Sequence, residues 1–148
     1  MGEALRMAFK AYRMEEVPVG AVVVHDSRII ARGFNQVELL KDATAHAEML
    51  ALTAAQSVIG DWRLNDCTLY VTKEPCPMCA GACYHTRLKR VVFGVSDPKA
   101  GAGGSAMNIL QFPSLNHYCE ITVGVREEEC RHLIQSFFRE RRDIKNSE

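Results

Sequence analysis

The sequence has no long apolar run, no excess of either charge and few aromatic residues. None of its apolar stretches approaches the roughly 18 residues that a membrane-spanning helix needs. The first residues lack the apolar block and the small-residue cleavage site of a secretory signal. The 18 basic and 18 acidic residues cancel, which argues against an indiscriminate nucleic-acid binder that works by charge alone. We therefore expect a cytoplasmic protein with no membrane partner.

Internal repeats, low-complexity segments and interdomain linkers are also lacking. A chain of 148 residues with 47% hydrophobic and 24% charged residues predicts one globular domain over residues 1–148. The glycine-rich segment 97–105 lacks the Gly-Lys-Ser/Thr ending of a phosphate-binding P-loop, which excludes that kind of nucleotide site. Such a chain can bury a core without cross-links, so we expect packed, reduced thiols at four cysteines: Cys67, Cys83, Cys119 and Cys130.

The hydrophobic pattern alternates between helix and strand periods. It predicts helices at 3–15, 45–57, 78–86 and 126–145, a short helical piece at 106–110, and strands at 19–24, 29–34, 67–72, 90–95 and 118–123. Strands that alternate with helices predict an α/β fold, in which a central five-stranded mixed sheet has helices on both faces in three α/β/α layers.

The first and last predicted helices each have an apolar face. On the first, the spacing predicts an inward face formed by Leu5, Ala8, Phe9 and Tyr12. On the last, it predicts that five residues lie inward: Cys130, Leu133, Ile134, Phe137 and Phe138.

Two short segments hold the candidate metal ligands. They are Thr-Ala-His-Ala-Glu at 44–48 and Glu-Pro-Cys-Pro-Met-Cys at 74–79. His46, Cys76 and Cys79 can supply three ligands to one Zn²⁺ ion per subunit, which in enzymes leaves the fourth position to water. Both segments are expected at neighbouring helix amino termini on one side of the sheet, where the helix dipole favours the thiolate form of cysteine.

Three further residues near these segments need an interpretation. Glu48 suits general acid–base catalysis, because a carboxylate beside the open metal position would carry a proton of the attacking water. We interpret Glu74 as a structural hydrogen-bond acceptor and not as a second catalytic acid. Cys83 follows Cys79 by one helical turn and could compete as a ligand, but a packed thiol fits its deeper position better.

His-x-Glu followed by Pro-Cys-x-x-Cys resembles the signature of the zinc-dependent cytidine deaminase superfamily. Within it, the chain is similar to the bacterial tRNA adenosine deaminases, which convert the wobble adenosine of a tRNA anticodon to inosine. The similarity runs from about residue 4 to residue 145 and includes 17–21, 35, 44–49, 69–72, 79–82, 91–94, 97–99, 116–117 and 137–139. The resemblance implies a cytidine deaminase-like fold, zinc-dependent hydrolytic deamination of adenosine, and a homodimer whose partner subunit helps to shape the site.

The resemblance also implies the residues that bind substrate. The expected partner is a tRNA anticodon stem-loop, with no DNA partner. Between residues 131 and 145 there are five basic and two acidic residues, so this predicted helix end can contact RNA phosphates. The implied contacts are Val17, Pro18 and Asn35 at the base, Asp97 and Lys99 at the flanking nucleotides, and Arg139, Arg141 and Arg142 at the backbone.

Two alternative functions stay open at this stage. Lys73, Pro77 and the pair at 83–84 depart from the adenosine deaminase pattern, and Pro-Cys-Pro-Met-Cys also resembles guanine deaminases. This leaves room for a deaminase of a free purine or pyrimidine base or nucleoside, although such an enzyme needs no basic helix end. A non-catalytic zinc module that binds RNA is the second alternative, and Glu48 argues against it because a structural zinc site needs no proton carrier.

Overall fold

The computed structural model describes residues 1–147, so Glu148, the last residue of the predicted domain, lies outside the described residues. The elements, in chain order, are α1 (Gly2–Arg13), β1 (Gly20–His25), β2 (Arg28–Phe34), α2 (Val37–Leu40), α3 (Ala47–Ile59), β3 (Cys67–Lys73), α4 (Pro77–His85), β4 (Arg90–Val95), β5 (Glu120–Val123) and α5 (Glu127–Asn146). Within residues 1–147, no helix is both long and apolar enough to cross a membrane.

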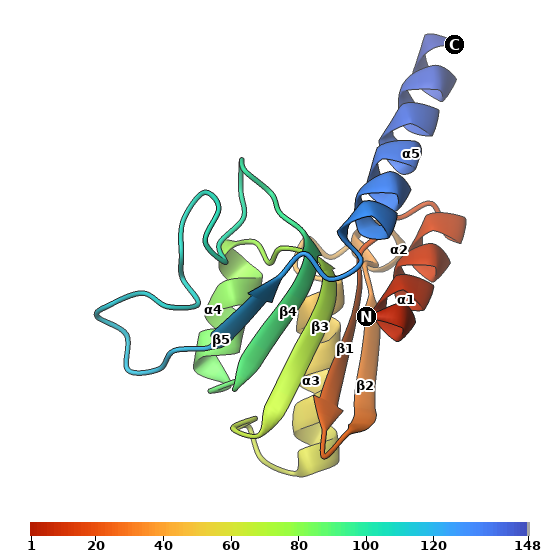
Figure 1. Cartoon of the computed structure of the whole chain (residues 1–148). Helices are drawn as coiled ribbons and strands as arrows, with labels where there is room; N and C mark the ends of the chain where they lie inside the picture. The colour runs from red at the N-terminus through yellow and green to blue at the C-terminus, as the bar shows by residue number, and fades with distance from the viewer. Residues whose placement is uncertain (148) are drawn as a thin grey trace.

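The strands form one mixed sheet in the order β2-β1-β3-β4-β5 (Figure 1). β1 pairs antiparallel with β2 and β3, whereas β3 pairs parallel with β4 and β4 parallel with β5. The predicted five-stranded mixed sheet is therefore confirmed. Its parallel part brings the ends of β3 and β4 to the same edge, where ligand sites of open α/β sheets lie.

Helices cover both faces of the sheet, as the sequence predicted. Successive side chains of a strand point to opposite faces of the sheet. Two strand glycines that lie against a helix backbone show which helix covers which face. A Cβ at Gly20 would lie 2.0 Å from the carbonyl oxygen of Ala4 in α1, and one at Gly33 would lie 2.4 Å from that of Ala47 in α3. The sheet thus lies between α1 and α5 on one face and α3 and α4 on the other, which gives three layers.

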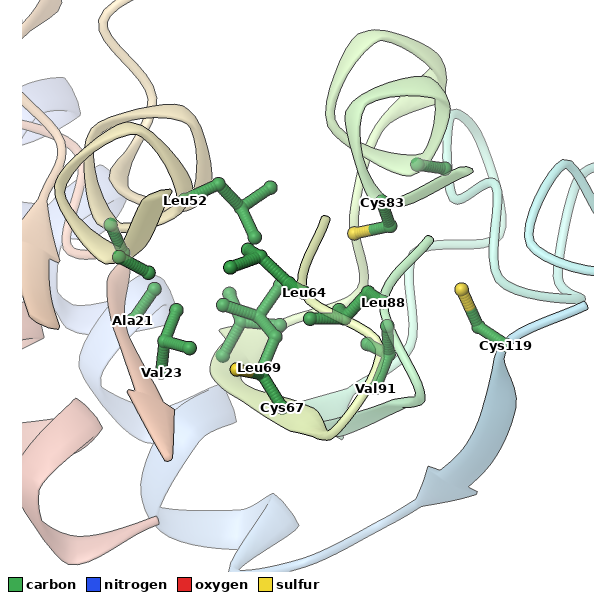
Figure 2. Close-up of a cluster of buried hydrophobic side chains, with 14 of the residues drawn as sticks. Ala21, Val23, Leu52, Leu64, Cys67, Leu69, Cys83, Leu88, Val91 and Cys119 are labelled. Atoms are coloured by element: carbon green, nitrogen blue, oxygen red, sulfur yellow. The ribbon is translucent and has the colours of Figure 1, made fainter. Parts of the chain in front are cut away.

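The core between the sheet and the α3–α4 layer is made of aliphatic side chains and thiols (Figure 2). Leu52 of α3, Leu69 of β3 and Val91 of β4 are almost fully buried there. All six cysteines are free, and the four that were predicted as packed thiols are buried, which confirms that prediction.

The segment between β4 and β5 contains no helix, so the predicted helical piece at 106–110 is wrong. Residues 101–104 are rich in glycine, which disfavours a helix. The backbone N–H groups of Met107 and Ile109 donate to the carbonyl oxygens of Gly101 and Ala102, six and seven residues earlier, and not four residues earlier as in an α-helix. The segment therefore folds back on its own glycine-rich part.

Two predicted inward residues are exposed. α1 buries its small side chains at Ala4, Ala8 and Ala11 together with Met7, because they permit close approach to β1, and Phe9 is left 49% exposed. α5 extends beyond the sheet edge (Figure 1). Phe137 is buried but Phe138 is 42% exposed. The helical period identified both amphipathic helices but placed Phe9 and Phe138 on the wrong side.

Candidate active site

The two predicted ligand segments lie at neighbouring helix amino termini. His46 is the N-cap residue of α3, and Cys76 is the N-cap residue of α4, whose first residue is Pro77. Proline is suited to this position, because it has the φ angle of a helix and its missing N–H would have no helical partner. Since α3 and α4 pack together on one face of the sheet, their amino termini bring an imidazole and two thiols to one place.

The three ligand atoms have the spacing of a tetrahedral metal site. His46 Nδ1 lies 3.6 Å from Cys76 Sγ and 3.5 Å from Cys79 Sγ, and all three atoms lie within 4.8 Å of one another. Nitrogen and sulfur ligands bonded to one Zn²⁺ ion at usual lengths with tetrahedral angles lie about 3.6 Å apart. The group could therefore hold a metal ion, and its N/S₂ donor set fits zinc with one position free.

The surroundings of the two thiols shift their pKa values in opposite directions. A hydrogen bond from Cys79 lowers the pKa of Cys76 to about 4, against the effect of burial, and His46 lowers it further. The same contact with Cys76, together with burial, raises the pKa of Cys79 well above its ordinary value. Cys76 therefore favours the thiolate form at neutral pH, which is the form that binds metals.

Glu48 lies in the first turn of α3 and is almost fully buried. Burial raises its pKa to about 7, and the nearby Cys76 thiolate acts in the same direction. Near neutral pH this carboxyl group can therefore both accept and release a proton. That is the property required of a general acid–base residue.

A cavity of about 850 Å³ opens in front of the ligand group. Seven of the predicted site residues line it: Val17, Asn35, His46, Glu48, Cys76, Asp97 and Arg141. Cys79 and Pro18 are buried behind its surface, and Lys99, Arg139 and Arg142 are exposed outside its lining. The fold thus brings the predicted metal ligands, Glu48 and most of the predicted base contacts to one cavity, but not every predicted RNA contact.

Asn35 presents an unused acceptor in this cavity. Its Nδ2 donates to the carbonyl oxygen of Val17 at 3.3 Å, which fixes the amide plane. Its Oδ1 is buried and has no hydrogen-bond partner among residues 1–147. A buried polar atom without a partner is costly, so a donor on a molecule in the cavity would satisfy it.

Lys73, which the sequence marked only as a departure, forms an ion pair with Asp97 at 3.3 Å. Both residues line the cavity. Burial would raise the pKa of Asp97, but the backbone N–H groups of Ala100 and Lys99 and the ammonium group of Lys73 together hold it below its ordinary value. Asp97 is therefore a fixed anion at the cavity wall. The spacing of Lys73 and Asp97 in the sequence did not indicate that they form an ion pair.

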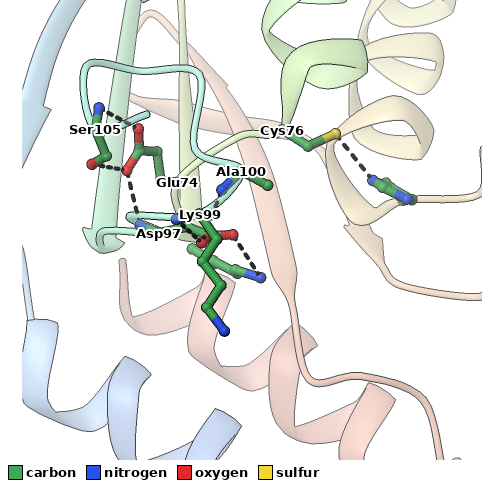
Figure 3. Close-up of polar contacts among 8 residues, drawn as sticks. Glu74, Cys76, Asp97, Lys99, Ala100 and Ser105 are labelled. Carbon is green, nitrogen blue, oxygen red and sulfur yellow. Dashed lines mark hydrogen bonds and ion pairs between the residues drawn. The ribbon is translucent and has the colours of Figure 1, made fainter. Parts of the chain in front are cut away.

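Glu74 holds the glycine-rich segment against the site, as its structural interpretation predicted (Figure 3). Its buried carboxylate accepts backbone N–H bonds from Asp97 and Gly103 at 2.9 Å and from Ser105 at 3.1 Å, and a bond from the Ser105 hydroxyl. These bonds fix the segment that carries Asp97. Because Glu74 directly precedes Pro75 and Cys76, one residue couples this segment to the ligand helix.

The sequence reasoning missed Glu16 and the short helix α2. Glu16 is almost fully buried, and its carboxylate accepts the backbone N–H groups of Glu38 at 3.0 Å and Leu39 at 2.7 Å. This contact holds the first turn of α2, which forms part of the cavity wall. The adjacent Glu15 carbonyl oxygen accepts a bond from Arg141 Nη2 at 2.8 Å. The pattern around Pro18 suggested only the end of α1, so nothing local signalled these contacts.

Known proteins resemble this chain over almost its whole length. The model of the MafB19-like deaminase family matches residues 1–142. A tRNA-specific adenosine deaminase of Bacillus subtilis (strain 168) is 50% identical over 147 residues, which cover 99% of this chain and 91% of that protein. A structure solved in a study of A-to-I editing by tRNA:A34 deaminases at the wobble position of transfer RNA superposes with a TM-score of 0.84. It is 41% identical and covers 88% of this chain and 94% of its own.

A guanine deaminase from Bacillus subtilis shares the fold less closely, with a TM-score of 0.63 at 35% identity over 80% of this chain and 79% of its own. The fold, the ligand geometry and these similarities agree. This chain belongs to the MafB19-like deaminase family, within the group that includes the tRNA-specific adenosine deaminases.

Proposed function

We propose that this protein hydrolytically deaminates adenosine to inosine at the wobble position of a tRNA anticodon. The observation that carries the proposal is the buried Glu48 carboxyl beside the His46, Cys76 and Cys79 group, in a chain half identical to a tRNA-specific adenosine deaminase. A structural zinc site has four protein ligands. Within residues 1–147 the ligand group has three members, which supports a catalytic site.

Zinc is the metal we propose, one ion per subunit, held by His46, Cys76 and Cys79. When bound, it supplies Lewis-acid chemistry that makes water acidic near neutral pH. Glu48 takes a proton from the water that attacks C6 of adenine and delivers it to N1 of the ring. The Glu48 carboxylate then takes the proton of the new C6 hydroxyl group and passes it to the exocyclic nitrogen. The C6–N bond breaks, ammonia leaves, and a C6=O bond forms, so that the product is inosine.

The cavity wall supports a role in binding the base. Asn35 Oδ1 is an acceptor without a partner in the described chain, and Val17 lies beside it, with Pro18 buried behind. We propose that these three residues hold the adenine ring. The fixed carboxylate of Asp97, with Lys99 beyond it, faces the nucleotides next to the target.

The basic end of α5 supports a role in binding the RNA backbone. Arg139, Arg141 and Arg142 lie in the C-terminal half of α5. The C-terminal end of this helix projects beyond the sheet (Figure 1). We propose that they contact phosphates of the anticodon stem-loop, which would reconcile a chain without net charge with a nucleic-acid substrate. We further propose that residues 1–148 act as one deaminase domain in a cytoplasmic homodimer, with no DNA partner.

The experiment that tests the substrate is inosine formation by the zinc-loaded protein. We expect turnover on an anticodon stem-loop with adenosine at the wobble position, and none on free adenine, guanine or cytidine. Preference for a free base or nucleoside would instead favour the guanine deaminase-like alternative. The cavity and fold are compatible with that alternative, but it gives the basic α5 end no role.

The experiment that tests the chemistry is the Glu48→Ala variant. We expect it to keep stoichiometric zinc and its affinity for RNA, because Glu48 is not a proposed ligand, while kcat falls by about 10²-fold to 10⁴-fold or more. Undiminished turnover would show that Glu48 has no catalytic role. Replacing Arg141 and Arg142 by alanine should weaken tRNA binding and flatten its salt dependence, and an unchanged slope would contradict the phosphate contacts.

A further inference from the structure

A row of four aromatic side chains leads away from the cavity along α5 and α1. Phe137 and Phe138 line the cavity and lie 5.4 Å apart between ring centroids. Phe137 contacts Tyr12 of α1 edge to face at 5.8 Å, and Tyr12 stacks on Phe9 at 6.2 Å. We name these four residues the aromatic row.

Both ends of the aromatic row are open to solvent. Phe138 is 42% exposed and Phe9 is 49% exposed, whereas Phe137 is buried and Tyr12 is half-buried between them. Packing does not explain the exposure of Phe9, because α1 is already held to β1 by Ala4, Met7, Ala8 and Ala11. An exposed phenylalanine at the end of a continuous aromatic contact is therefore available to another molecule.

Cations lie over two rings of the aromatic row, Phe9 at one end and Phe137 within it. The Arg13 guanidinium lies over the Phe9 ring at 5.2 Å, and the Arg141 guanidinium lies over Phe137 at 4.8 Å. Lys10 lies one residue further along α1 and is exposed. Acidic groups also lie near the row: the Glu140 carboxylate accepts the Tyr12 hydroxyl and raises the pKa of Tyr12, and Glu15 and Glu16 line the adjoining cavity. The surface is thus aromatic, carries cations on its rings and is continuous with the cavity.

This combination fits an unpaired polynucleotide strand better than a protein or a small molecule. Unstacked bases bind to aromatic rings and to guanidinium planes, and the phosphates bind to the cations beside them. We propose that the aromatic row is a track on α1 that binds unpaired RNA nucleotides adjacent to the target adenosine. The inference rests on the proposed function, since the strand enters the track from the cavity.

The chain supplies a matched control for this track. Trp62 is also 49% exposed, and the Arg63 guanidinium lies over its ring at 4.5 Å. It precedes the first residue of β3, whereas the cavity lies at the last residues of β3, so the pair occupies the opposite end of the sheet. Phe9→Ala and Arg13→Ala can therefore be compared with Trp62→Ala and Arg63→Ala.

The experiment measures binding of a labelled anticodon stem-loop and of a single-stranded oligoribonucleotide by fluorescence anisotropy, in zinc-loaded protein. We expect Phe9→Ala to raise Kd about 5-fold to 150-fold, the range for loss of one base stacked on an aromatic ring. Arg13→Ala should reduce the slope of log Kd against log salt by about 1. The Trp62 and Arg63 variants should bind as the wild type does, and circular dichroism should show all four folded.

The outcomes separate this inference from the proposed function. If the wild type forms inosine but the Phe9 and Trp62 variants bind RNA equally well, the track is wrong and the deaminase remains. If the wild type forms no inosine, the proposed function fails, and the anisotropy comparison still decides whether α1 binds RNA. If Phe9→Ala changes the oligomeric mass and leaves RNA binding intact, the row is a protein interface and the track is overturned.

Discussion

Replacing Glu74 by glutamine tests how strongly one buried carboxylate holds the active-site wall. Glutamine keeps the shape of the side chain but turns one acceptor oxygen into an NH₂ group. One carboxylate oxygen accepts N–H bonds from Gly103 and Ser105, and the other accepts from the Asp97 N–H and the Ser105 hydroxyl. The cheaper orientation places NH₂ toward Asp97, because the Ser105 hydroxyl can turn and accept a bond.

The loss in free energy of unfolding depends on which hydrogen bonds the glutamine weakens or removes. One partly buried N–H group, that of Asp97, loses its acceptor, which costs about 1–3 kcal/mol. The bonds from Gly103 and Ser105 lose the benefit of a charged acceptor, which brings the total to about 2–4 kcal/mol in the free energy of unfolding. For a domain of this size, that corresponds to a Tm lower by about 4–16 °C.

The assay is thermal and urea unfolding of the zinc-loaded protein at one fixed protomer concentration, with steady-state deamination of a stem-loop measured in parallel. We expect KM to rise more than kcat falls, because the loosened segment carries Asp97 and not the metal ligands. Glu120→Gln is the control, since Glu120 is an exposed glutamate on β5, and it should melt like the wild type.

Two results would refute this reasoning. A Glu74→Gln variant that melts like the control would show that the four bonds contribute nothing net to stability. An unchanged Tm with kcat lowered about 10²-fold or more would instead identify Glu74 as a second catalytic acid, the alternative that the structure makes unnecessary.

Three more predictions concern the fold and the metal. Gly20→Ala should lower the free energy of unfolding in urea by about 3 kcal/mol or more through overlap with α1, whereas Gly81→Ala, in open space on α4, should raise it by about 0.5–1 kcal/mol. Glu16→Ala should speed amide hydrogen exchange at Glu38 and Leu39 about 10-fold or more, because both N–H groups lose their acceptor. Unchanged exchange rates would show that Glu16 does not stabilise the first turn of α2. Removal of zinc by a chelator should lower the Tm reversibly, because zinc at about 1,000 times its Kd stabilises the folded state by about 4 kcal/mol. An unchanged Tm would contradict the proposed metal site.

The sequence determined the parts of this protein that depend on near neighbours in the chain. Strand and helix periods located all five strands and the four long helices, because periodicity depends on residues a few positions apart. The spacing of Cys76 and Cys79 identified a ligand pair, because residues three apart in the first turn of a helix lie on one side. The His-x-Glu and Pro-Cys-x-x-Cys signature added His46 as the third ligand and Glu48 as the acid–base residue. Local geometry and this signature were enough for these predictions.

The tertiary structure decided what depends on distant contacts. Glu74 binds a segment about thirty residues later through the backbone N–H groups of Gly103 and Ser105, and the segment that follows forms no helix at 106–110. Close packing of Ala4 and Ala8 against Gly20 turned α1 so that Phe9 faces solvent. The ion pair between Lys73 and Asp97 joins two strand ends that only the parallel pairing of β3 and β4 brings together. Such contacts leave no periodic trace in the sequence, because their energy depends on which surfaces meet after the chain has folded.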